Sequence, residues 1–378
     1  MYLTFGLLSI LGLSKLDDYN QVNATIVLEG LFLFLSFITI ISSNFKQQEK
    51  KFLSISILII LYILVSGVIA IGFQERNVMD FLGAYKAFFY ISIICLYIKD
   101  DVFSLKVTKN IFYFLLIVFL LKYSTSRLFF GILRPGVFTE NNFELGLLCL
   151  MYLALSDFLG KYKSSTFIVL AVIIVLSGSR SGLASLCVLY FATHVTKIDL
   201  RLAFKLGTLV LLFSFSFIMF MNQADGDVEN IDRYRFLLVF LDEIESWGIV
   251  NYLFGTMPIT PLQPSSCSTL SFYDGLYSYS GDGTCYPVIL HAYLLRVILV
   301  HGLIGLFAML FIYWLLFAHS RLSKAKIFGF FMIVLCNSLS VSAVNSIYFT
   351  FGILFIMSSK SWHININKII VHKEKINY

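Results

Sequence analysis

Residues 52–73 read FLSISILIILYILVSGVIAIGF, a run without one charged side chain. A helix of this length is about 33 Å long, enough to cross the hydrocarbon core of a bilayer. Further apolar segments lie at 2–13, 22–42, 81–98, 111–122, 143–160, 165–178, 182–195, 202–221, 288–318, 327–342 and 345–359. The pattern predicts an all-α polytopic membrane protein with about 12 transmembrane helices.

The composition excludes a soluble domain. Of the 378 residues, 58% are hydrophobic and only 13% are charged, and the mean hydropathy is +0.85. A soluble domain would carry about a quarter charged residues. No internal repeat is visible, so the inverted halves that many transporters show are not expected.

The net charge of +6 reflects topology rather than nucleic-acid binding. With the N-terminus inside, 18 of the 28 basic residues fall in segments expected to be cytoplasmic, against eight in outer segments. This is the bias that the positive-inside rule describes. We therefore expect lipid, and no nucleic acid, as the partner of the basic residues.

The main interruption is an acidic loop at 222–287, expected on the outer side. It divides the chain into helices 1–9 at 1–221, the loop, helices 10–12 at 288–359 and a basic cytoplasmic tail at 360–378. A structureless loop of this length is uncommon, so we expect it to be folded. Apolar residues at helical spacing within 234–247 predict an amphipathic helix at the membrane surface.

Two cysteines, Cys267 and Cys285, lie in this loop. In an oxidising compartment they are expected to form a disulfide, which would stabilise the fold by about 3 kcal/mol. Two free thiols are the alternative. No suitably spaced His or Cys accompanies the pair, so no metal site is expected.

The same loop carries aromatic and acidic side chains that suit carbohydrate. We expect Tyr273 and Tyr277 to cover the C–H faces of sugars, and Asp274 and Asp282 to bind hydroxyl groups. A polar cap over the helix ends is the alternative for any one of these residues.

Arg180 lies in the hydrophilic break SGSRSG at 177–182, between two apolar segments. Ionisable groups at a membrane are costly and point to function. A guanidinium offers paired donors for phosphate oxygens, and small neighbours let backbone N–H groups approach a ligand. A plain turn is the alternative, but a turn requires no arginine. Arg134, in RPGVFTENN at 134–142, is expected to bind anions too, with one of the asparagines capping the next helix.

Three further arginines are expected to complete a diphosphate site. Arg233 and Arg235 flank Tyr234, and because residues two apart on a helix face different ways, only one is expected to enter the site. Arg296 lies about 7.5 Å deeper along its helix than His291. A buried arginine there needs an anionic partner, which a lipid diphosphate would supply.

His291 begins the span that follows the loop. An imidazole titrates near neutral pH, so His291 is a candidate general base toward a sugar hydroxyl; a structural histidine is the alternative. The sequence has no P-loop and no Cys/His metal spacing. ATP-driven transport and metal-assisted hydrolysis therefore lack their motifs.

Together these segments resemble the superfamily of Wzy-type O-antigen polymerases and O-antigen ligases, which act on undecaprenyl-diphosphate-linked glycans. The resemblance is carried by Arg134–Phe138 with Asn141, by Leu176–Leu183, by Arg233–Gly255 and by His291–Gly305, in the family's order. Members have one large periplasmic loop and resemble GT-C glycosyltransferases in architecture. This sequence departs from them at Glu140, where many relatives have proline, and at Ile289, Leu290 and Ala292 around the histidine.

The resemblance implies a glycosyltransferase of the bacterial inner membrane that polymerises lipid-linked O-antigen repeat units at the periplasmic face. Arg180 and an arginine of the loop would grip the diphosphate, and His291 would match the proposed catalytic histidine of the ligases. No cofactor is required, because the activated bond lies in the lipid donor, and a membrane protein that regulates chain length is an expected partner. The alternatives are an O-antigen ligase, and a polysaccharide flippase or transporter.

Overall fold

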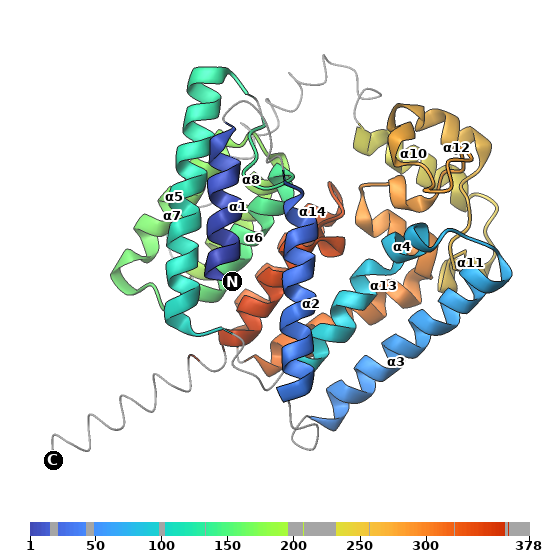
Figure 1. Ribbon diagram of the computed structural model, residues 1–378, viewed down its shortest axis with the longest axis horizontal. Coiled ribbons are helices and arrows are strands. Elements are labelled where there is room, and N and C mark those ends of the chain that lie inside the picture. The colour runs from blue at the N-terminus through green and yellow to red at the C-terminus, as the bar shows by residue number, and fades with distance from the viewer. Residues whose placement is uncertain are drawn as a thin grey trace.

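The computed structural model describes residues 1–15, 22–42, 49–97, 103–132, 134–195, 207, 232–256, 258–320, 322–359 and 362. Every regular element within these ranges is a helix (Figure 1). Four helical stretches, Ala24–Ile41, Lys50–Phe73, Val78–Tyr97 and Tyr293–His319, are long and apolar enough to cross a membrane. The chain is an all-helical membrane protein; the expected number of about 12 crossings stays a prediction.

The helices occur where the apolar segments predict them. In chain order they are α1 (Tyr2–Ser14), α2 (Ala24–Ser42), α3 (Lys50–Gly67), α4 (Val78–Ile94), α5 (Leu105–Phe130), α6 (Asn141–Leu155), α7 (Lys163–Leu176), α8 (Arg180–His194), α10 (Asp232–Ile244), α11 (Ile249–Phe254), α12 (Pro264–Thr269), α13 (Tyr293–His319) and α14 (Lys324–Ser338), with a final helix Ile347–Ser359. The expected span 202–221, the start of the loop at 222–231 and the tail lie outside the described residues, apart from residues 207 and 362. Figure 1 shows α1 and α5–α8 on one side of α2, and α3, α4 and α10–α13 on the other.

Helix α5 is much longer than the expected 111–122, and its ends are set by a capping serine and a left-handed glycine. Ser104 caps its first turn by accepting a hydrogen bond from the N–H of Val107, and Gly131, at φ 66°, ends it. Lys122 is buried, and its Nζ donates to the carbonyl oxygen of Gly12 at 3.0 Å. It thereby satisfies the C-terminal end of α1, where a helix leaves carbonyl groups unpaired.

Helix α13 is interrupted at Gly302, which has φ 65° and ψ −173°. The end of α11 packs against this break so closely that a Cβ on Gly302 would lie 2.3 Å from the carbonyl oxygen of Leu253. The N–H of Thr256 donates to the carbonyl oxygen of Leu299 at 2.8 Å. The break frees carbonyl groups of α13, and Thr256 pairs one of them, as a membrane interior requires.

A disulfide joins Cys267 on α12 to Cys285, with a Cα–Cα distance of 5.9 Å. These are the two cysteines whose pairing the sequence predicts. The N–H of Leu262 donates to the carbonyl oxygen of Cys285 at 2.9 Å. The hydroxyl of Tyr277 donates to the carbonyl oxygen of Cys267 at 2.6 Å. The cross-link thus fixes the segment that carries Tyr277.

Loss of this disulfide should destabilise the segment 262–285. We expect Cys267→Ser/Cys285→Ser to lower the free energy of unfolding by about 2–4 kcal/mol, because the open loop gains conformational entropy when unfolded. Thermal unfolding of the purified protein measures the change, and Cys336→Ser, at a half-buried free thiol, is the matched control. If wild-type protein alkylated under denaturing conditions has the same intact mass with and without prior reduction, the bond is absent.

Candidate functional site

The loop that carries Arg134 is organised by one buried carboxylate. Glu144, in the first turn of α6, is fully buried and accepts hydrogen bonds from the backbone N–H groups of Val137 (2.8 Å), Phe138 (2.7 Å) and Thr139 (2.8 Å). Hydrogen bonds to a buried carboxyl group are strong where water is excluded. The loop is therefore held in one conformation, with Arg134 exposed at its start. Sequence reasoning missed Glu144, although an acid at the edge of an apolar span was a usable signal.

The turn that carries Arg180 is organised by its small residues. Gly178 has φ 63°, a conformation that glycine adopts without strain. Ser179 caps α8 by accepting a hydrogen bond from the N–H of Gly182 at 3.0 Å, and Ser177 Oγ accepts one from the N–H of Ser179 at 3.1 Å. The serines thus serve the turn itself, and Arg180 is left at the first position of α8, half-buried.

Two asparagines connect these loops. Asn141 Nδ2 donates to the carbonyl oxygens of Pro135 (2.9 Å) and Ser177 (3.1 Å), and Asn142 Oδ1 accepts from Ser179 Oγ at 2.6 Å. The expectation that an asparagine caps α6 is wrong: the N-cap is Glu140, which makes no side-chain capping bond. The asparagines instead fix the distance between the loops of Arg134 and Arg180.

Helix α10 directs one of its two arginines toward this region. Arg233 Nε donates to Ser340 Oγ at 3.2 Å, after the end of α14. Arg235 points elsewhere, with its guanidinium over the ring of Phe272 at 5.1 Å. Arg233 lies close enough to Arg134 and Arg180 for their charges to act on one another, and we call these three residues the three-arginine cluster.

The electrostatics of the three-arginine cluster show that its members lie within each other's field. Burial, followed by the charges of Arg233 and Arg134, lowers the pKa of Arg180 to about 10, against a smaller opposite effect of Asp232. Burial and the charge of Arg134 likewise lower the pKa of Arg233. A lowered pKa means that the protonated form is disfavoured. An anion bound among the three guanidinium groups would remove this penalty.

Helix ends and carboxylates complete the surroundings of the cluster. Helices α6, α8 and α10 all begin beside it, and helix N-termini favour anions. The carboxylate of Asp232 opposes the lowering of the pKa at Arg180 and Arg233, and that of Glu140 opposes it at Arg233. Burial raises the pKa of Glu140, more than its bond to Asn142 and the nearby arginines lower it.

His291 lies beside the cluster, just before α13. Its ring packs against Phe236 and Tyr273, with centroid distances of 5.9 and 5.3 Å. Burial, then the charges of Arg296 and Arg233, lower the pKa of His291 from its ordinary value, with Asp232 opposing them. The imidazole is therefore neutral at neutral pH and able to accept a proton.

The fifth expected arginine is separate from the cluster. Arg296 is buried in α13, and its guanidinium donates to the carbonyl oxygen of Gly83 and lies 5.7 Å from the ring centre of Tyr293. It lines a cavity of about 740 Å³ between α2, α4 and the segment 274–279. His291 also lines this cavity, so the histidine lies between the two groups of cations.

The four residues expected to bind sugar separate in the same way. Tyr277 and Asp274 line the cavity of Arg296. Tyr273 stacks on Phe236 and donates to Asp232 Oδ2 at 3.1 Å, so it lies beside the three-arginine cluster and not in the cavity. Asp282 is fully exposed, and hydrogen bonds with Thr284 lower its pKa. It shapes a turn and does not line the cavity.

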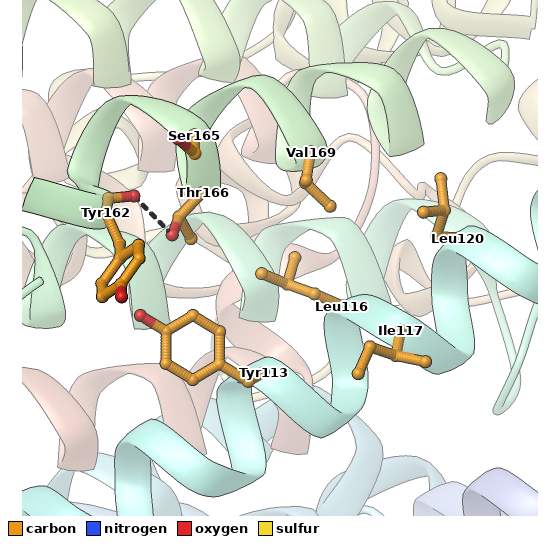
Figure 2. Close-up of a pocket in the computed structure, with 8 residues that line it drawn as sticks. All are labelled: Tyr113, Leu116, Ile117, Leu120, Tyr162, Ser165, Thr166 and Val169. Carbon is orange, nitrogen blue, oxygen red and sulfur yellow. Dashed lines mark hydrogen bonds between the residues drawn. The ribbon is translucent and has the colours of Figure 1, made fainter.

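A second cavity of about 430 Å³ lies between α5 and α7. Figure 2 shows the hydroxyl ends of Tyr113 and Tyr162 facing one another at one end, with leucine, isoleucine and valine side chains along the rest. It contains none of the expected site residues. Nor do three His, Cys, Asp or Glu side chains gather as a metal site would require, within the part of the chain that the structure describes.

Comparison of the sequence with protein-family models gave no match, and comparison with curated proteins gave no significant match.

Proposed function

We propose that this protein is a glycosyltransferase that joins undecaprenyl-diphosphate-linked oligosaccharide repeat units at the periplasmic face of the bacterial inner membrane, as an O-antigen polymerase does. The observation that carries the proposal is the convergence of Arg134, Arg180 and Arg233 beside a neutral His291. Three guanidinium groups suit a diphosphate, because planar paired donors match its several anionic oxygens.

In this proposal the arginines act on the leaving group. The bond between the anomeric carbon of the donor sugar and the diphosphate oxygen breaks, and its electron pair stays on the diphosphate. The three-arginine cluster stabilises the charge that develops there, which is the kind of effect that dominates in many enzymes. Asn141, Asn142 and Glu144 act indirectly, because they fix the loops that carry the arginines.

In the same proposal His291 acts on the acceptor, the sugar whose hydroxyl attacks the donor. Its neutral imidazole takes the proton of the attacking sugar hydroxyl, whose oxygen forms the new glycosidic bond. The rings of Phe236 and Tyr273 hold the imidazole in place. Its position between the cluster and the cavity of Arg296 suits a group that meets a donor on one side and an acceptor on the other. Neither a metal nor a cofactor has a part in this scheme.

A polysaccharide flippase or transporter is the second candidate, and one observation favours it. Glu29, Lys86 and Arg296, charged residues within the membrane spans, all line the same cavity. Transporters commonly gather such charges along a substrate path. An O-antigen ligase would share the three-arginine cluster and differ in its acceptor, so adding lipid A–core to a donor assay separates ligase from polymerase.

Removal of Arg180 should abolish polymerisation. We expect Arg180→Ala to reduce the rate by about 10²–10³, because a donor aimed at the leaving diphosphate is lost, and Arg180→Lys to be impaired since a point charge does not replace a planar fork. The readouts are the lipopolysaccharide ladder in cells and product length with purified lipid-linked donor. Arg235→Ala, at the arginine over Phe272, is the matched control and should have a smaller effect. Full-length chains in Arg180→Ala would contradict the proposed polymerase, and transport without polymerisation would support the flippase.

The charge of Arg233 should be visible in the titration of His291. Because Arg233 disfavours the protonated imidazole, Arg233→Gln should raise the pKa of His291 toward its ordinary value near 6.5. The acid limb of the activity profile should then move to higher pH. NMR titration, with the signal assigned by His291→Gln, measures the pKa directly, and Arg235→Gln should leave it unchanged. A pKa that falls or stays constant in Arg233→Gln would contradict the arrangement.

The orientation can be tested by labelling. A cysteine at the exposed position of Ser280 should react with a membrane-impermeant maleimide in cells with a permeabilised outer membrane. A cysteine at the exposed position of Lys161 should react only after lysis, because the positive-inside rule places it in the cytoplasm. The opposite pattern would place the three-arginine cluster on the cytoplasmic side and contradict the proposal.

A further inference from the structure

The cavity between α2, α4 and residues 274–279 has walls that are fixed before any ligand binds. Ser278 Oγ donates to Asp80 Oδ2 at 2.5 Å, and the N–H of Tyr279 donates to Asp80 Oδ1 at 3.3 Å. These bonds attach the loop to the start of α4. Tyr277 is held in turn by its bond to the carbonyl oxygen of Cys267, within the disulfide.

Several charged groups of this cavity already have partners within the protein. Lys86 forms an ion pair with Glu29, which also accepts a hydrogen bond from the hydroxyl of Tyr90 at 2.9 Å. Asp80 is engaged by Ser278 and Tyr279. No further cation is needed for these two carboxylates.

Arg296 is the exception. Its side chain is only 3% exposed, its guanidinium bonds to the carbonyl oxygen of Gly83, and its Nε is buried without a hydrogen-bond partner. Among the described residues no carboxylate lies within ion-pair distance of it, whereas Lys86 and Lys326 each have one. A buried cation without a counter-ion is costly. The missing partner is therefore expected to be an anionic group of a ligand.

The rest of the cavity is suited to carbohydrate. Tyr277, Tyr279 and Tyr286 offer ring faces, and Asp274 offers a carboxylate. The volume of about 740 Å³ lies within the range of small-molecule sites, roughly 300–1,000 Å³. His291 is at its edge, and the three-arginine cluster lies beyond the histidine.

We infer that this cavity binds the acceptor glycan through a negatively charged group at Arg296, and that the protein therefore has two anion sites, one on each side of His291. The acceptor role rests on the proposed function; the binding site does not. The anionic oxygens come from one of two sources, the carboxylate of an acidic sugar or the diphosphate of a carrier lipid.

Binding of two small probes to the full-length protein in nanodiscs separates the sites. We expect Arg296→Met to weaken the binding of D-glucuronate about tenfold, because a charged hydrogen-bond donor is lost, and to leave that of pyrophosphate unchanged. Arg180→Ala should have the reverse effect. Saturation-transfer NMR titrations give both dissociation constants. Lys161→Gln controls for non-specific charge effects, because Lys161 is exposed and lies at the opposite end of α7 from the turn of Arg180.

A second variant keeps the test independent of folding. Glu29→Gln/Lys86→Met replaces the ion pair in the wall of the cavity without leaving a lone charge, and it should also weaken glucuronate binding. Thermal unfolding of each variant checks that the fold is retained. If Arg296→Met weakens pyrophosphate instead of glucuronate, the cavity takes the lipid diphosphate. If both folded variants bind both probes like the wild type, the inference is overturned. If Arg180→Ala keeps pyrophosphate binding while Arg296→Met loses glucuronate, the proposed function fails and the cavity site stands.

Discussion

The carboxylate of Glu144 is the interaction on which the candidate site depends. It is fully buried, and its three backbone donors are consecutive residues of the loop that begins at Arg134. If the carboxylate were removed, three N–H groups would be left unpaired, which costs much more than the bonds contribute net. Asn141 extends the same network to the turn of Arg180. The hydrogen bonds of Glu144 and Asn141 therefore hold the loops of Arg134 and Arg180 in place against the repulsion among the three arginines.

The interior of the helical bundle follows one rule, since every irregular backbone group there must find a partner. Lys122 pairs a carbonyl group at the end of α1, and Thr256 pairs one at the break of α13. Asn345 accepts from the N–H of Ala87 and donates to the carbonyl oxygen of Gly83, so it bonds to successive turns of α4. Because Arg296 bonds to the same carbonyl oxygen, the backbone of α4 also positions the cation of the cavity.

The sequence was sufficient to predict where the described helices of the bundle lie, because they follow from hydropathy along the chain. It was not sufficient to predict lateral neighbours. Arg180 lies in a hydrophilic break and Arg296 within an apolar segment, but neither pattern shows that the two belong to different sites, as they do in the structure. Helical geometry alone indicated that Arg233 and Arg235 face different ways, but not which of them enters the cluster. The place of Glu144 at the edge of an apolar span was a signal, but its partners are backbone groups, which have no sequence signature.

The outer faces of α10 and α11 have a consequence for how a ligand would reach this site. Leu237 and Leu241 are exposed on α10, and Ile249 and Val250 on α11, the last two by 73% and 63%. Apolar surface of this kind partitions into the headgroup boundary of a bilayer. The arginines at the start of α10 are then kept at a fixed height beside the phosphates. A lipid-borne ligand would find them by lateral diffusion in two dimensions, without leaving the leaflet.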